Sequence, residues 1–285
     1  MAALDVQRIS VIGAGTMGSG IAQVAARAGY ETRLFDVAEG AAQKAVARIG
    51  DSLARAVEKG RCSAEEREQA LARLAVERDL DAAASFADLV VEAAPEDLQL
   101  KRELFARLSK AARPEAILAT NTSSLPITAI ASAAAKPERV IGLHFFNPVP
   151  AMKLLEIVQG ERTDPMVVTA ARAVGARLGK EVVVVRDAPG FATSRLGIAL
   201  AMEAIRMLEE GVASAEEIDR AIELGYGHPM GPLKLTDQVG LDVRLAIAEH
   251  LTSELGERFR APQLLRRLVR AGKLGKKSGE GFYKY

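Results

Sequence analysis

The sequence R-I-S-V-I-G-A-G-T-M-G, residues 8–18, decides the fold of this chain. An apolar segment typical of a buried strand, residues 8–12, runs directly into a turn with three glycines. A strand that enters a helix through a G-x-G-x-x-G turn opens a dinucleotide-binding βαβ unit. In such a turn Gly13 permits the tight bend, Gly15 lets the backbone approach a pyrophosphate, and Gly18 lets the helix pack against the strand.

The residues after this turn complete the unit. A helical pattern begins at Thr16 and Met17 and ends before Gly29. Its first turn offers free N–H groups and the positive end of the helix dipole to a phosphate. A second strand, 31–35, ends in Asp36, 18 residues beyond the last glycine of the turn. A carboxylate at this position binds a free ribose 2′-hydroxyl and repels a 2′-phosphate, so we predict NAD rather than NADP as the cofactor.

Composition sets the broad class of the protein. The chain has 285 residues, of which 49% are hydrophobic and 26% charged, as in an ordinary soluble protein of two domains. A net charge of +1 argues against nucleic acid as a main partner. Cys62 is the only cysteine, so we expect no disulfide within the chain and assign no metal site. No apolar run approaches the ~20 residues that span a bilayer, and the N-terminus lacks a secretory pattern. We therefore expect a cytoplasmic protein without a membrane partner.

Strand patterns alternate with helical patterns through the first two thirds of the chain. After the first two strands we predict strands at 88–93, 117–120, 140–145, 153–158 and 181–186. This alternation predicts a Rossmann-type, doubly wound and mainly parallel sheet over residues 1–186. Ligands of such sheets bind at the carboxyl ends of the strands. Asn121 follows one strand directly, and we expect it to contact the cofactor.

The pattern changes at the breaker Asp187-Ala188-Pro189-Gly190. Beyond it no strand pattern is evident, and helical patterns cover 191–210, 214–224, 241–255 and 261–271. We therefore predict an all-helical second domain over residues 187–285.

One histidine and one glutamate stand out as a chemical pair. His144 ends an apolar strand pattern, and Glu156 lies inside the next one, across a turn that contains Pro148 and Pro150. A carboxylate within a buried strand is costly unless another group pairs with it, and the turn returns Glu156 to His144. A buried imidazole held by a carboxylate can act as a general base.

With these parts assembled, the chain resembles the L-3-hydroxyacyl-CoA dehydrogenase family over almost its whole length, and the short bacterial 3-hydroxybutyryl-CoA dehydrogenases in particular. The resemblance rests on motifs in the family's order: GAGTMGSGIAQ (13–23), VVEAAPEDLQLKRELF (90–105), NTSSLPI (121–127), HFFNPVPAMKLLEIV (144–158), HPMGP (228–232), GLDV (240–243) and LGKKSGEGFYKY (274–285).

The resemblance implies an activity and roles for named residues. It implies reversible, NAD-dependent oxidation of an L-3-hydroxyacyl-CoA to the 3-ketoacyl-CoA, in fatty acid or butanoate metabolism. His144 matches the base that removes the hydroxyl proton, and Glu156 the group that orients it. Ser123 matches a serine that contacts the substrate.

Four further residues receive roles from the resemblance alone. Glu96 and Lys101 match positions near the cofactor. Ser52 and Lys59 match positions that contact the CoA moiety.

The chain departs from the family where Pro189-Gly190-Phe191 is usually followed by an Asn-Arg pair. Ser194 takes the place of the asparagine that approaches the substrate. Serine keeps a donor and an acceptor but reaches less far, which puts the acyl preference in question.

The sequence leaves competing functions open and predicts one protein partner, a second copy of the chain. A 3-hydroxyadipyl-CoA dehydrogenase and a CoA-independent sugar-acid dehydrogenase are the competing enzymes, and a crystallin-like protein without turnover is the competing class. The family is usually dimeric, and the apolar helical segments 196–208 and 241–251 are the predicted homodimer interface.

Overall fold

The computed structural model describes residues 4–285 of the chain. They form two compact units, the first ending at Ala188 and the second beginning at Pro189. The division lies two residues beyond the predicted boundary between 186 and 187.

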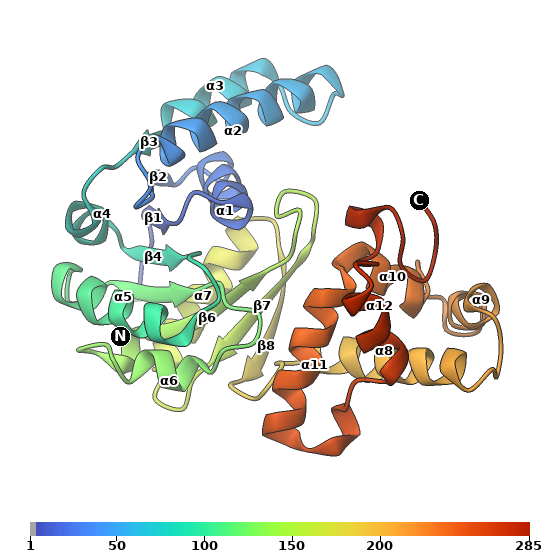
Figure 1. Ribbon diagram of the computed structural model, residues 1–285. Helices are drawn as coiled ribbons and strands as arrows, with labels where there is room; N and C mark the ends of the chain where they lie inside the picture. Colours follow the sequence, from blue (N-terminus) through green and yellow to red (C-terminus); the bar gives the residue numbers. More distant parts are fainter. Residues whose placement is uncertain (1–3) are drawn as a thin grey trace. The chain divides into compact units, whose positions relative to one another are not determined.

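The first unit is built on one eight-stranded sheet with the order β3-β2-β1-β4-β5-β6-β7-β8 (Figure 1). The strands are β1 (Arg8–Ile12), β2 (Glu31–Phe35), β3 (Leu74–Val76), β4 (Leu89–Glu92), β5 (Ile117–Thr120), β6 (Val140–Phe145), β7 (Leu154–Gln159) and β8 (Glu181–Arg186). The pairings from β3 to β6 are parallel, β6 and β7 are antiparallel, and β7 and β8 are parallel. The predicted mainly parallel, doubly wound sheet is confirmed.

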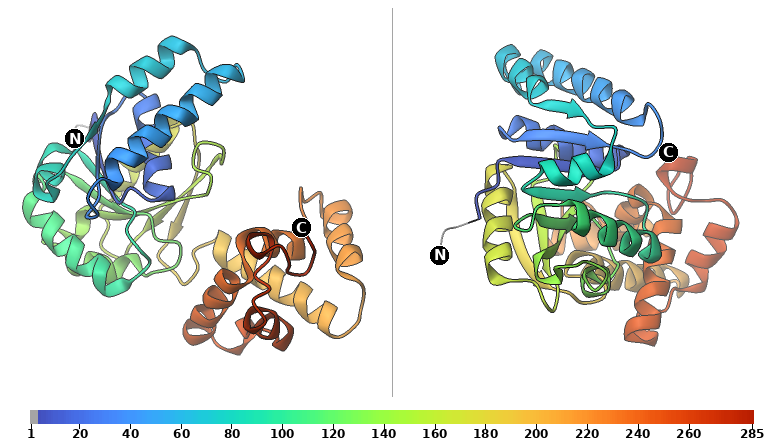
Figure 2. Two further views of the ribbon diagram at one scale, coloured as in Figure 1. Left: turned by 45° about the horizontal axis from the view of Figure 1, so that its top comes forward. Right: turned by 90° about the vertical axis from the view of Figure 1, so that its left-hand side faces the viewer.

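The central strands are covered on both faces. Every residue of β4, β5 and β6 is buried, which matches their nearly continuous apolar sequences. A core cluster joins one face of the sheet to α1 (Thr16–Arg27), α2 (Ala41–Glu58), α3 (Ala64–Ala72) and α7 (Pro165–Arg177). The other face carries α4 (Leu80–Phe86), α5 (Leu98–Ala111) and α6 (Ile127–Ala131) (Figure 2).

Four short elements of this unit escaped the sequence analysis: β3, α4, α6 and the 3₁₀ helix Pro137–Arg139. Each has only three to seven residues, too few to show a clear period. The edge strand β3 is fixed by parallel pairing with β2, which is a tertiary contact.

The second unit is helical, as predicted. It contains α8 (Thr193–Glu209), α9 (Ala215–Tyr226), α10 (Pro232–Val239), α11 (Leu241–Leu255) and α12 (Gln263–Arg270), and its only β pairing in residues 189–285 is in isolated bridges near the C-terminus. The sequence analysis gave no helical pattern between residues 224 and 241 and so missed α10. Pro232 is the first residue of that helix, where its fixed φ is favourable and its missing N–H costs nothing.

Two buried carboxylates hold the C-terminal segment onto this unit. Asp237 is fully buried and accepts hydrogen bonds from the N–H groups of Phe282 and Tyr283, each at 2.9 Å, and from the Tyr285 hydroxyl at 3.1 Å. Asp219 accepts one from the Tyr283 hydroxyl at 2.8 Å. The two tyrosines at the end of the chain are therefore anchored to the helical core.

None of the helices in residues 4–285 is both long and apolar enough to cross a membrane.

Candidate active site

The glycine turn after β1 has the geometry that the motif requires. Gly13 has a φ of +106°, and its N–H donates to the carbonyl of Phe35 at 2.8 Å. A Cβ atom at Gly18 would lie 1.7 Å from the carbonyl oxygen of Gly13, so only glycine allows α1 this close to the turn. At Gly15 a Cβ atom would meet nothing within 4 Å. The structure thus has open space where a pyrophosphate would approach the backbone and the N-terminus of α1.

Asp36 is tied to this turn. One of its carboxylate oxygens accepts a hydrogen bond from the N–H of Ala14 at 2.6 Å, and the other accepts one from Ala38 at 2.8 Å. Val37 between them is 92% exposed. Arg33, the cation closest to Asp36 in the sequence, pairs with Glu77 at 2.7 Å and lies over the ring of Phe86. The carboxylate therefore stands beside the phosphate turn, and Arg33 is held by other partners.

His144 and Glu156 are brought together by the antiparallel pairing of β6 and β7. They are partners in the register, and Nδ1 of His144 lies 2.8 Å from Oε2 of Glu156. Glu156 is fully buried, and 8% of the His144 side chain is exposed. The ring of Phe146 lies against the imidazole, with centroids 4.3 Å apart. The hairpin thus fixes the orientation of a nearly buried histidine.

Asn121 supports this histidine from the neighbouring strand. Its side-chain oxygen accepts a hydrogen bond from the N–H of Phe145 at 2.9 Å. The amide of Asn121 therefore holds the end of β6 in place, one residue beyond His144.

The turn after β5 is organised by Glu96. One oxygen of this carboxylate accepts hydrogen bonds from the Thr122 hydroxyl at 2.6 Å, and from the N–H and hydroxyl of Ser123 at 2.9 and 3.1 Å. The Glu96 side chain is 38% exposed. Ser123 and Glu96 thus lie together at the carboxyl edge of the sheet.

Lys101, expected to contact the cofactor, has a side chain that is only 1% exposed. Its Nζ lies 2.6 Å from Oε1 of Glu92 and 3.8 Å from Oε2 of Glu96. The sequence analysis did not single out Glu92. Glu92 could have been identified in the sequence as a lone carboxylate in an apolar strand, the feature that identified Glu156.

A cavity of about 590 Å³ runs along the first turns of α1. It is lined by Gly15, Thr16, Ser19, Gly20, Gln23, Arg48, Ile49, Ser52 and residues 147–151. Ser52 therefore lies where a long ligand could extend from the glycine turn, whereas Lys59 is exposed at the far end of α2 and does not line this cavity. The sequence analysis did not assign Asn147 or Arg48 to the site. Arg48 donates a hydrogen bond to the carbonyl of Ala14 at 3.1 Å. Both residues line the cavity because the fold brings α2 and the β6–β7 turn close to the glycine turn, which the sequence alone does not show.

Ser194 belongs to the second unit, where it is half-buried as the second residue of α8. The chain reaches this helix through a sharp bend, in which Gly190 and Phe191 both have positive φ angles, of 74° and 49°.

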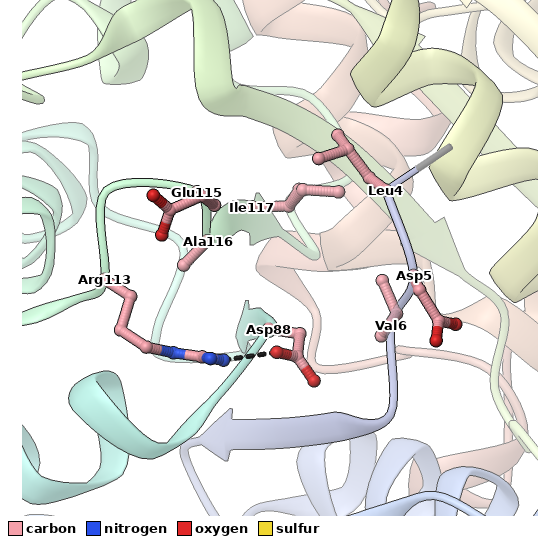
Figure 3. A pocket seen from close by; sticks show the side chains of 8 residues that line it. All are labelled: Leu4, Asp5, Val6, Asp88, Arg113, Glu115, Ala116 and Ile117. Atoms are coloured by element: carbon pink, nitrogen blue, oxygen red, sulfur yellow. Dashed lines mark hydrogen bonds and ion pairs between the residues drawn. The ribbon is translucent and has the colours of Figure 1, made fainter. Parts of the chain in front are cut away.

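A second cavity, of about 60 Å³, lies at the opposite edge of the sheet (Figure 3). It is lined by residues from the amino ends of β1, β4 and β5, and Asp88 points into it beside Arg113 (Figure 3). Burial alone would raise the pKa of Asp88, but hydrogen bonds from the N–H of Gln7, from Arg113 and from the N–H of Arg8 lower the pKa below its usual value. The ionised carboxylate of Asp88 links the amino end of β1 to Arg113 ahead of β5. It lies at the amino ends of the strands, whereas His144 lies at the carboxyl end of β6. Within residues 4–285 no group of three or more acidic, histidine or cysteine side chains is placed to hold a metal ion.

Two family models match the chain: the 3-hydroxyacyl-CoA dehydrogenase NAD binding domain over residues 8–188, and the C-terminal domain of the same family over residues 190–285. A 3-hydroxybutyryl-CoA dehydrogenase of Mycobacterium tuberculosis is 46% identical over 98% of this chain and 99% of its own. A 3-hydroxyadipyl-CoA dehydrogenase of Escherichia coli is 45% identical over 98% of this chain and 59% of its own.

A solved structure of the (S)-3-hydroxybutyryl-CoA dehydrogenase of Ralstonia eutropha superposes with a TM-score of 0.95, at 39% identity and over 99% of both chains. The glycine turn, the two-unit fold and these matches agree. The chain belongs to the 3-hydroxyacyl-CoA dehydrogenase family of NAD-dependent oxidoreductases.

Proposed function

We propose that this enzyme oxidises short-chain (S)-3-hydroxyacyl-CoA, with 3-hydroxybutyryl-CoA as its substrate, to the 3-ketoacyl-CoA, and that the reaction is reversible. The observation that carries the proposal is the buried His144–Glu156 pair at 2.8 Å, in a chain with the fold of 3-hydroxybutyryl-CoA dehydrogenases. When bound, NAD supplies the acceptor for the hydride that leaves the carbinol carbon.

His144 is the general base of this proposal. When Nδ1–H donates to Glu156, Nε2 keeps its lone pair and can take the proton of the substrate hydroxyl. The carboxylate of Glu156 then stabilises the imidazolium that forms. In the reverse direction the same imidazolium returns its proton to the carbonyl oxygen.

Ser123 and Glu96 assist at the reacting end. The N–H of Ser123 holds this residue on Glu96 at 2.9 Å, and in our proposal the hydroxyl turns its hydrogen from Glu96 to the reacting oxygen when the substrate binds. Glu96, Lys101 and Asn121 support the nicotinamide side of the cofactor, while Asp36 binds the adenosine ribose. In our proposal Ser194, which is half-buried on α8, also contacts the substrate.

The cavity along α1 is the proposed path of the CoA arm. Its volume of about 590 Å³ and its lining by Ser52 suit an extended, largely uncharged pantetheine chain. Lys59, seven residues further along α2 and about 10 Å away, would meet the phosphates beyond it.

We further propose a homodimer through the helical domain. Leu196 on α8 is 71% exposed and Val243 on α11 is 41% exposed, although both helices also contribute to the core of the unit. Large apolar side chains that are exposed on two neighbouring helices favour burial against a second copy of the chain. Light scattering of the purified protein tests this.

The second candidate substrate is 3-hydroxyadipyl-CoA, because a relative with that printed activity is 45% identical. The experiment is to measure initial rates of NADH formation with (S)-3-hydroxybutyryl-CoA, (S)-3-hydroxyadipyl-CoA, the (R) isomer and free 3-hydroxybutyrate, each with NAD and with NADP. Preference for the (S)-butyryl thioester with NAD is expected. Preference for the adipyl thioester would replace the substrate and leave the mechanism intact.

His144→Gln is the control for the base. It should bind NAD as the wild type does and lose turnover. Turnover near the wild-type rate would remove His144 from the mechanism.

A further inference from the structure

A charged pair is buried at the centre of the first unit, next to the site. Glu92, the last residue of β4, is fully buried, and Lys101 on α5 is 1% exposed. Their charged atoms are 2.6 Å apart. Such a pair costs several kcal/mol of desolvation per ion, which its own attraction repays only with further hydrogen bonds.

Both groups have those further bonds. One oxygen of Glu92 also accepts from the N–H of Ala94 at 2.6 Å, and the other accepts from the Thr120 hydroxyl at 2.6 Å. Nζ of Lys101 also donates to the carbonyl of Ala94 at 3.2 Å. The pair is therefore fixed at the carboxyl ends of β4 and β5, where a Rossmann-type sheet binds its ligand.

Lys101 stands between two carboxylates and binds them unequally. Glu92 holds the ammonium group at 2.6 Å, whereas Glu96 is 3.8 Å away. Glu96 instead directs Oε1 to the turn after β5, where it accepts hydrogen bonds from Thr122, Ser123 and Ser124. Lys101, Glu92 and Glu96 together have a net charge of −1. The uncompensated negative charge lies on Glu96, the more exposed of the two carboxylates and the one that holds Ser123.

The geometry points to Glu92 as a positioning residue of the reaction. We propose that Glu92 keeps Lys101 away from Glu96, and so leaves Glu96 available to hold, through the N–H of Ser123, the turn that presents the Ser123 hydroxyl. Without the charge of Glu92, the buried ammonium would have Glu96 as its remaining carboxylate partner within 4 Å. It would draw Glu96 toward itself and away from the turn. The inference rests on the proposed function, in which Ser123 contacts the reacting oxygen.

The decisive variants are Glu92→Gln, which removes only the charge, and Glu92→Gln with Lys101→Met, which removes both charges. Because a displacement of about 1 Å at a positioning group can cost about 100-fold in rate, we expect Glu92→Gln to lower kcat between ten- and 100-fold. At saturating NAD the double variant should be at least about threefold faster than Glu92→Gln, because no cation remains to displace Glu96, and it should stay slower than the wild type because Lys101 also supports the cofactor. A double variant as slow as the single one would overturn the proposal.

Thr120→Val is the matched control for packing. It deletes the hydrogen bond from the Thr120 hydroxyl to Oε2 of Glu92 and leaves both charges in place. We expect kcat to stay within about threefold of the wild type, whereas a loss as large as that of Glu92→Gln would show that the general integrity of the cluster matters, not the charge.

Two measurements distinguish a positioning role of Glu92 from a role in stability alone. In a Ser123→Ala background, Glu92→Gln should cause no further loss of kcat, because the group that it positions is already gone. A crystal structure of Glu92→Gln should show Nζ of Lys101 closer to Glu96 than the present 3.8 Å. An unchanged distance would refute the proposal even if the wild type proved to act on another substrate. Absence of wild-type turnover with every acyl-CoA tested would instead refute the proposed function.

Discussion

Nδ1 of His144 lies 2.8 Å from Oε2 of Glu156, and the two residues face each other as register partners across β6 and β7. The backbone pairing of the hairpin, and not side-chain adjustment alone, sets the separation of base and carboxylate. A slip of one residue would turn one of them to the other face of the sheet. The pair is therefore specified by strand register.

Replacing Glu156 should impair the reaction more than it impairs the fold. Glu156→Gln keeps the volume but removes the charge and can turn an amide NH₂ donor toward Nδ1, so the histidine can adopt the other tautomer. In a serine protease the equivalent exchange lowers kcat by about 10⁴-fold, and we expect a loss of at least about 100-fold here. The measurement is kcat at saturating substrate and NAD, with the melting temperature as control. A loss below tenfold would mean that Glu156 only fills space.

Two glycines of the turn should separate folding from cofactor binding. Gly18→Ala places a methyl group 1.7 Å from the Gly13 carbonyl oxygen and should lower the free energy of unfolding by about 3 kcal/mol. Gly15→Ala meets nothing within 4 Å in the protein. It should unfold like the wild type but bind NAD more weakly. Calorimetry and NAD titration check both variants, and equal stability loss in the two would contradict the assignment of Gly15 to the ligand.

Asp36 should control the choice between NAD and NADP. Asp36→Ser removes the charge that repels a 2′-phosphate, and Val37→Arg adds a cation at a side chain that is 92% exposed. Because a hydrogen bond to a charged group contributes about 1.5–3 kcal/mol, kcat/KM with NAD should fall about tenfold or more in the double variant. With NADP it should rise. Single Val37→Arg is the control, since it keeps Asp36; if it alone reversed the preference, Asp36 would not be the determinant.

Alkaline pH should weaken the second unit through its terminal tyrosines. Burial, the charge of Asp237 and the hydrogen bond to it raise the pKa of Tyr285 to about 12. The unfolded chain releases this proton near pH 10, before the folded protein does, so stability falls as the pH rises from 10 through 12. Urea unfolding at pH 8, 10 and 11 should show this loss, and Tyr285→Phe should reduce it. An unchanged pH dependence in that variant would place the titration elsewhere.

Removing the charge of Arg244 should stabilise the helical unit. This residue of α11 is 7% exposed, its Nε has no hydrogen-bond partner within residues 4–285, and burial lowers the pKa of its guanidinium. Because burial of a charge is costly and one N–H donor of this guanidinium stays unsatisfied, Arg244→Met should raise the free energy of unfolding by about 1 kcal/mol. Chemical denaturation measures this, with Arg267→Met on the surface of α12 as a control of small effect. A destabilised Arg244→Met would show that the guanidinium binds an anion or a second copy.

Short windows of sequence determined much of this protein. The glycine turn, the acid that ends β2 and the apolar runs of the central strands each depend on backbone conformation or burial within a few residues. The same holds for the long helices of the second unit. A proline can begin a helix as well as end one, so the local pattern around Pro232 could not reveal α10.

The tertiary structure decided which charges meet. Lys101 follows Glu92 by nine residues, with a loop and the start of α5 between them, and no sequence period links the two. The resemblance predicted Lys101 near the cofactor but gave no sign of its pairing with Glu92. Packing of α5 on the sheet buries Lys101 against Glu92 and leaves Glu96 to the turn that bears Ser123. Local periodicity is set by neighbours along the chain, but the energy of a buried charge depends on groups that only the folded sheet brings within 3–4 Å.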